Sequence, residues 1–138
     1  MRHPGFGVAT AVLVLAAGIS HAQDADLGRQ IFEERCAVCH GAGGAGDGMV
    51  GELFAAKPKD LKLLGRENGG VYPFDDVYRA IDGRTSIAAH GNSEMPVWGR
   101  YFMEEAIDNP AINDKNARYI TEGRVLALVY YLQTLQVE

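Results

Sequence analysis

Two cysteines and a histidine fall within five consecutive residues, Cys36-Ala37-Val38-Cys39-His40. Thiols separated by two residues lie one helical turn apart, so each can add to a vinyl group of haem and form a thioether. The adjacent histidine then lies under the iron and offers it a ring nitrogen. The C-x-x-C-H spacing therefore predicts one haem c, attached covalently to Cys36 and Cys39, with His40 as the proximal iron ligand.

Three other interpretations of these residues remain, each with a physical objection. A thioredoxin-like dithiol would need the cysteines at the start of a helix that follows a strand, whereas here they end an expected helix. A zinc site would take every cysteine and histidine after residue 22, namely Cys36, Cys39, His40 and His90. Residues adjacent in sequence, such as Cys39 and His40, rarely reach one tetrahedral metal together. A disulfide between the two cysteines would leave His40 without a role.

The second axial position of the iron is assigned to Met95. Met95 and Pro96 stand in a polar loop between two expected helices, 55 residues after His40, so the chain can wrap around the macrocycle. Pro96 has a fixed backbone angle and no amide hydrogen, which stiffens the loop. Methionine and histidine are the common partners of a proximal histidine, so His90 is the alternative, and an open position is the third case.

Two further methionines of the expected mature chain suit the iron less well. Met49 lies only nine residues after His40, and Met103 falls within a helical pattern. Packing into the core is the usual role of a methionine on such a face.

The N-terminus has the pattern of a secretory signal peptide. Arg2 and His3 form a short basic start, residues 6–17 are almost wholly apolar, and Ser20-His21-Ala22 supplies small residues at the cleavage positions. The pattern predicts a signal peptide over residues 1–22 and a mature domain over residues 23–138. The alternative is an uncleaved N-terminal anchor helix. In either case the domain works outside the cytoplasm.

Composition limits the remaining choices. The chain has 138 residues, the size of one domain, and its 47% apolar and 22% charged residues are ordinary for a globular protein. A net charge of -5 argues against a general nucleic-acid binder, which would carry a basic face. No run of 18 apolar residues exists, so an ordinary membrane span is not expected.

The mature chain is expected to be all-α, because apolar residues recur at helical spacing and no useful stretch alternates like a strand. The expected helices run from Asp24 into Cys36, from Pro73 to Gly83, from Pro96 to Glu105, and from a cap at Thr121 to the chain end. Residues 41–51 contain six glycines and should form a loop, and residues 52–71 should be irregular. The glycines match G-x-G-x-x-G by letter, but no strand precedes them, so they indicate no dinucleotide site.

These features together resemble the class I c-type cytochromes, small monohaem bacterial electron carriers. The resemblance covers nearly the whole mature chain. It is carried by the C-x-x-C-H-G motif at residues 36–41, Gly46-Asp47-Gly48, Lys57-Pro58-Lys59-Asp60-Leu61, Met95-Pro96-Val97-Trp98-Gly99 and residues 128–132. It implies a cytochrome c-like fold, with crossing N- and C-terminal helices and further short helices and loops around the haem. In such a crossing Gly28 and Phe32 would pack against Leu128 and Tyr131.

The resemblance also suggests roles for residues near the second axial ligand. Trp98 resembles the aromatic residue that lies near a haem propionate, although a core aromatic would have the same spacing. The polar stretch from Glu104 to Ile120 resembles an insertion, which would be a partner surface or, by preference, a solvated loop.

The function implied is single-electron transfer by a periplasmic carrier between redox partners of a respiratory or dehydrogenase chain. With both axial positions filled, the iron has no vacancy for oxygen or peroxide, so no enzymatic activity is expected. Two alternatives stay open: a cytochrome subunit of a dehydrogenase or oxidase complex, and a haem enzyme or sensor with a displaceable Met95.

Partners are expected to be redox proteins that dock transiently, with no nucleic acid and no stable membrane insertion unless the signal is uncleaved. The acidic total suggests a basic patch on the partner. Against this, a local basic run is formed by Lys57, Lys59, Lys62 and Arg66.

Overall fold

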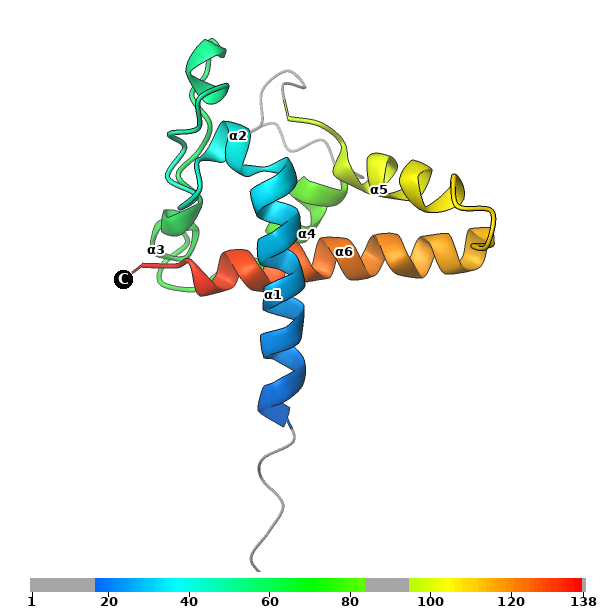
Figure 1. The fold of residues 1–138 in the computed structure, drawn as a ribbon. Helices are drawn as coiled ribbons and strands as arrows, with labels where there is room; N and C mark the ends of the chain where they lie inside the picture. The colour runs from blue at the N-terminus through cyan, green and yellow to red at the C-terminus, as the bar shows by residue number, and fades with distance from the viewer. Residues whose placement is uncertain (1–16, 84–94, 138) are drawn as a thin grey trace, which may run out of the picture.

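The computed structural model describes residues 17–83 and 95–137, with side chains from Ala25 onward, and this part of the chain is all-helical. The elements, shown in Figure 1, are α1 (Ala17–Arg35), α2 (Ala37–His40), η1 (Gly51–Leu53), η2 (Leu61–Leu63), α3 (Leu64–Glu67), α4 (Phe74–Asp82), α5 (Trp98–Ile107) and α6 (Asp114–Thr134). The expected all-α fold is confirmed. Among the described helices, none is both long enough and apolar enough to cross a membrane.

The fold is centred on the crossing of α1 over α6 (Figure 1). At the crossing point Gly28 meets the backbone of α6, where an added Cβ would collide with the carbonyl of Ala127 and lie 2.7 Å from Cβ of Tyr131. One turn further along α1, Phe32 is buried and its ring centroid lies 5.3 Å from that of Tyr131. The predicted crossing of the N- and C-terminal helices, with Gly28 and Phe32 at the contact, is therefore confirmed.

The core lies around α6, whose apolar face contacts α1, α4 and α5. Val125, Leu128 and Val129 of α6 are 1% exposed or less. Phe102 of α5 and Ile81 of α4 complete this buried cluster. Because α1 and α5 both pack on α6, this helix fixes where the residues carried by each of them lie.

The helix predicted between Pro73 and Gly83 is also confirmed. Acidic Asp75 and Asp76 stand in the first turn of α4, where the helix dipole favours negative charge. Gly83 ends the helix with φ 78°, and its amide donates to the carbonyl of Arg79.

The predicted start of the last helix is wrong. The helix begins at Asp114, and Asn113 is the cap, because its side-chain oxygen accepts from the amide of Asn116 at 3.0 Å. Thr121 is buried inside the helix and donates its hydroxyl to the carbonyl of Ala117 at 2.9 Å. The stretch expected to be a solvated loop thus holds the end of α5 and the first turns of α6, with polar residues outside and Ala117 fully buried.

Two other predicted boundaries differ from the structure. α1 begins at Ala17, seven residues before Asp24, since no helix-breaking proline stands between them. Residues 61–67 form η2 and α3 instead of irregular chain, because the carboxylate of Asp60 accepts from the amide of Lys62 at 2.9 Å and caps the first turn.

The close approach of α1 and α6 generates a prediction about Gly28. Gly28→Ala forces the two helices apart and should destabilise the protein by about 1–3 kcal/mol, the usual cost of overpacking. The matched control is Gly123→Ala on α6, where an added Cβ meets nothing within 4 Å. That control should stabilise the protein by about 1 kcal/mol through helix propensity. Guanidinium unfolding of both variants measures the difference, and equal effects would contradict the crossing geometry.

Candidate haem site

The two cysteines occupy one tight turn between helices. α1 ends at Arg35, and α2 begins at Ala37. Across the turn the amides of Cys39 and His40 both donate to the carbonyl of Cys36, at 3.1 and 2.9 Å. Both cysteines are free thiols and partly buried. The structure therefore places the two sulfur atoms and the imidazole on a single turn that follows a helix, as expected.

Burial raises the pKa of the Cys36 thiol to about 12, and the neighbouring Cys39 adds to the shift. A redox-active dithiol or a zinc thiolate is favoured by surroundings that lower the pKa instead. Within the described residues no group of three or more His, Cys, Asp or Glu side chains could hold a metal ion. His90, the fourth residue of the zinc alternative and the alternative axial ligand, lies outside the described residues.

The imidazole of His40 is oriented by a backbone group. Its Nδ1 lies 3.3 Å from the carbonyl oxygen of Lys59. A carbonyl can only accept, so Nδ1 is the protonated nitrogen and the lone pair resides on Nε2. Histidines that ligate metals commonly donate their other ring nitrogen to a carbonyl in this way, which fixes the ring and raises its basicity. His40 therefore fits the role of an iron ligand through Nε2.

The glycine loop after α2 packs against the backbone of this turn. Gly46 has φ 75°, and its amide donates to the carbonyl of His40 at 2.8 Å. A Cβ added at Gly48 or Gly51 would lie 2.6 or 2.5 Å from the carbonyl oxygen of Cys39. The loop follows a helix and leads into η1, so the absence of a dinucleotide fingerprint here is confirmed for this segment. The glycines allow one stretch of backbone to lie against another.

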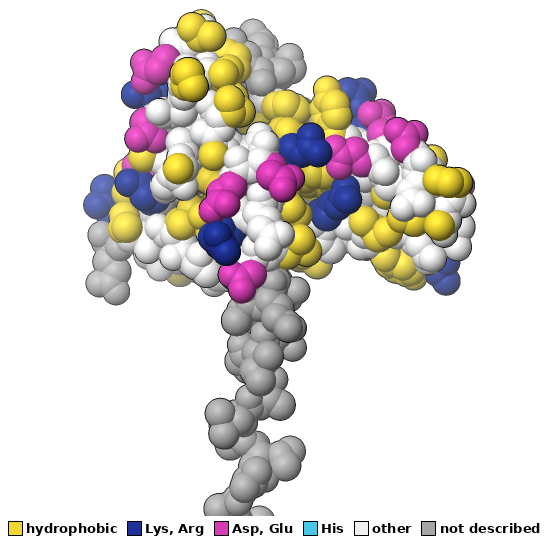
Figure 2. All heavy atoms as spheres, in the orientation of Figure 1, with side chains coloured by type: hydrophobic (Ala, Val, Ile, Leu, Met, Phe, Trp, Pro, Cys, Tyr) yellow, Lys and Arg dark blue, Asp and Glu magenta, His cyan; other side chains and the backbone are white. Residues whose placement is uncertain are grey.

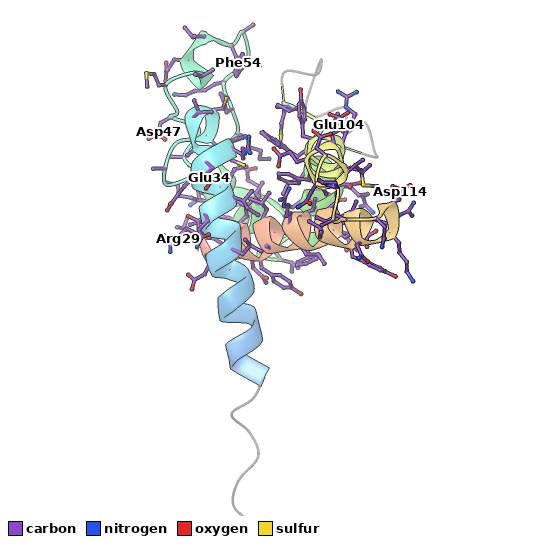
Figure 3. All side chains as sticks on the ribbon, turned by 45° about the vertical axis from the view of Figure 1, so that its right-hand side comes forward. Arg29, Glu34, Asp47, Phe54, Glu104 and Asp114 are labelled. Atoms are coloured by element: carbon purple, nitrogen blue, oxygen red, sulfur yellow. The ribbon has the colours of Figure 1, made fainter. Side chains whose placement is uncertain are left out.

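Met95 packs against the same core as the cysteine turn. It lies directly before Pro96 and three residues before α5, and it is partly buried against the cluster that Cys36 also contacts. Figures 1 and 3 show α2 and α5 on the same side of α6, facing each other. The structure thus brings the elements that carry His40 and Met95 together from 55 residues apart.

The other methionines are placed differently. Met49 is 83% exposed on the glycine loop. Met103 lies within α5, where the hydroxyl of Thr121 approaches its sulfur at 3.8 Å. Both positions agree with the sequence argument that neither suits the iron.

Trp98 is the first residue of α5 and belongs to an aromatic group. Its ring centroid lies 5.7 Å from that of Phe102 and 5.8 Å from that of Tyr101. The side chain is partly buried against the core. This packing accounts for the aromatic residue, and a contact with a haem propionate stays a prediction.

Sequence reasoning missed two groups of residues at the site. The carbonyl of Lys59 carries no side-chain signature, since any residue could supply it. Four further apolar residues are partly buried against the core: Leu64, Tyr72, Phe74 and Tyr78. A helical period could have revealed the last two, but the others lie in segments expected to be irregular.

The basic run predicted from the sequence is neutralised locally. Its three lysines each pair with an acid: Lys57 with Glu52 at 3.4 Å, Lys59 with Glu67 at 2.7 Å and Lys62 with Asp60 at 3.9 Å. Figure 2 accordingly shows basic and acidic side chains interspersed over this face. Interspersed charges of both signs give little long-range steering of a partner.

Comparison with known families identifies the chain. Residues 23–111 match the family described as cytochrome C oxidase, cbb3-type, subunit III, which is more than half of the chain. The chain belongs to this family. It is an electron-transferring c-type cytochrome domain, and the resemblance drawn from the motifs is confirmed. The match spans every candidate site residue: Cys36, Cys39, His40, Met95 and Trp98. No curated protein and no solved structure matches this cytochrome.

The packing of the glycine loop on the cysteine turn generates a second prediction. Gly48→Ala pushes the backbone of Cys39 aside and should lower both the haem content and the stability, the latter by about 1–3 kcal/mol. The matched control is Gly43→Ala in the same loop, where an added Cβ has nothing within 4 Å. The ratio of haem absorbance to protein and thermal unfolding measure the two effects. A Gly48→Ala variant that behaves like the control would show that the loop does not support the turn.

Proposed function

We propose that this cytochrome carries single electrons between redox proteins outside the cytoplasm. One haem c is attached to Cys36 and Cys39, and the iron is held between Nε2 of His40 and the thioether sulfur of Met95. The chain contains two cysteines and one C-x-x-C-H motif, which supports a single haem.

The observation that carries the proposal is the hydrogen bond from His40 Nδ1 to the carbonyl of Lys59. It fixes the tautomer and the ring direction before any metal is considered, and such a bond raises the basicity of the ligating nitrogen. The chemistry that bound haem supplies is one-electron exchange between ferrous and ferric iron. Met95 would add a soft thioether, which favours ferrous iron and raises the reduction potential. Apolar residues around the site exclude water and act in the same direction.

The location of the domain is supported by two independent boundaries. The family match begins at residue 23, directly after the predicted cleavage site that follows Ala22. A cleaved signal over residues 1–22 would release a domain of residues 23–138 into the periplasm. An uncleaved signal would leave the same domain anchored to the membrane and facing the periplasm.

The family description favours one second function, that of a cytochrome subunit in an oxidase complex. Electron transfer through the site would be the same in both cases. The two differ in whether the cytochrome leaves its partner after each electron. Co-purification of the native protein from solubilised membranes distinguishes a bound subunit from a free carrier.

Replacement of Met95 tests the closed iron site. Ferric wild-type protein should show the weak charge-transfer band at the red end of the visible spectrum that iron–thioether coordination gives, and its ferrous form should bind little carbon monoxide. Met95→Ala should lose the band and bind carbon monoxide readily, because one axial position becomes open. Met49→Ala, at the exposed methionine, is the control and should behave as wild type. Absorption spectra of both oxidation states measure these effects.

Two outcomes would contradict this proposal. Loss of the band in His90→Ala but not in Met95→Ala would assign the ligand wrongly. Ready binding of carbon monoxide by the wild-type protein, or peroxide turnover well above that of free haem, would favour the enzyme or sensor alternative.

A further inference from the structure

Three charged side chains from three helices meet beside the cysteine turn. The carboxylate of Glu105, on α5, accepts from the guanidinium of Arg35 at 2.9 Å through Oε1 and from that of Arg124 at 3.0 Å through Oε2. Arg35 is the last residue of α1, directly before Cys36, and Arg124 belongs to α6. The three side chains are 32–44% exposed, so they are partly removed from water. Glu105 therefore connects the helix before the cysteine turn with the helix after Met95.

A second set of contacts leads from this group toward Met95. The guanidinium of Arg124 lies 5.6 Å from the ring centroid of Phe102, within the range of a cation–π interaction. Phe102 packs in turn against Trp98, the first residue of α5. Met95 stands three residues before Trp98 and is partly buried against the same core. The inner face of α5 is thus held along its length, from Glu105 to the loop of Met95.

The other ion pairs in the described part of the chain are local. They lie within one helix or between neighbouring loop segments: Arg29 with Asp26 and Glu33, Arg79 with Asp76, Arg100 with Glu104, and the lysine pairs of residues 52–67. Isolated exposed pairs of this kind contribute little to stability, whereas one carboxylate shared by two arginines forms a network. Charge therefore ties α1, α5 and α6 together at Glu105.

We propose that Glu105 is a positioning residue for the Met95 ligand. By holding α5 to the end of α1 and to α6, it restricts movement of the Met95 loop away from the turn that carries His40. This inference rests on the proposed function, because it concerns Met95 as an iron ligand. α5 also packs on α6 through buried Phe102 and Ala106, so loss of the charge loosens α5 without unfolding the chain. The consequence is that Glu105 slows release of the thioether and entry of an external ligand.

Binding of imidazole to the ferric holoprotein tests this role, since Met95 must leave before imidazole can bind. At saturating imidazole the rate reports release of the thioether. Glu105→Gln should raise this limiting rate about two- to tenfold, the effect expected for losing one or two partly exposed ion pairs. Glu104→Gln is the matched control. Glu104 is the preceding residue of α5, is more exposed, and pairs only with Arg100 of the same helix at 3.9 Å among the described residues. The control rate should stay close to that of the wild type.

Two further measurements keep the test independent of a single variant. Salt at 1 M, where the Debye length is about 3 Å, should raise the wild-type rate toward that of Glu105→Gln and leave the variant unchanged. Hydrogen exchange of the α5 amides, followed by mass spectrometry on the holoprotein, should be faster in Glu105→Gln than in Glu104→Gln. This second readout does not depend on the iron or its ligands.

The outcomes separate this inference from the proposed function. Absence of the iron–thioether band in the wild-type protein would overturn Met95 ligation, and with it the role of Glu105 toward Met95. Presence of the band with equal imidazole rates, equal salt responses and equal exchange in the two variants would overturn the role of Glu105 alone.

Discussion

The close approach of α1 to α6 at Gly28 is the contact on which the arrangement of the site depends. A side chain at this position would collide with the carbonyl of Ala127, so only glycine lets α1 lie directly on α6. The end of α1 then brings Cys36 onto the core that α6 builds. α5 packs on the same helix and brings Met95 to that core from the other end of the domain. One helix crossing thus sets the relation between two halves of a site whose residues are far apart in sequence.

The composition of the core explains why a covalent cofactor suits so small a domain. Several large apolar side chains contact the buried cluster but stay only partly buried themselves: Leu64, Tyr72, Phe74, Tyr78, Met95 and Trp98. A short chain has limited apolar surface of its own to bury, and cofactors or crosslinks commonly supply what is missing. We expect bound haem to complete the burial of these residues. A flat apolar group held at Cys36 and Cys39 would add to the core what the helices alone do not provide.

Sequence patterns predicted those features that side chains specify locally. The C-x-x-C-H motif, the helix ended by Gly83 and the glycine at the helix crossing each depend on residue type at a fixed spacing. The start of α6 was predicted wrongly because Thr121 and Asn113 are both good capping residues, and the burial that decides between them is a tertiary property. The carbonyl of Lys59 could not be found at all, since its role is played by the backbone. Ion pairs between distant residues, such as Arg35 with Glu105, likewise require the fold to be known.

The most direct test of the central claim is the intact mass of the mature protein after denaturation, purified from a host that attaches haem in its periplasm. A chain of residues 23–138 with a single haem that survives acidic organic solvent is the result expected for two thioethers at Cys36 and Cys39. Replacement of both cysteines by serine should abolish the added mass. Release of the haem into the solvent from the wild-type chain, or a mass without haem, would contradict the account.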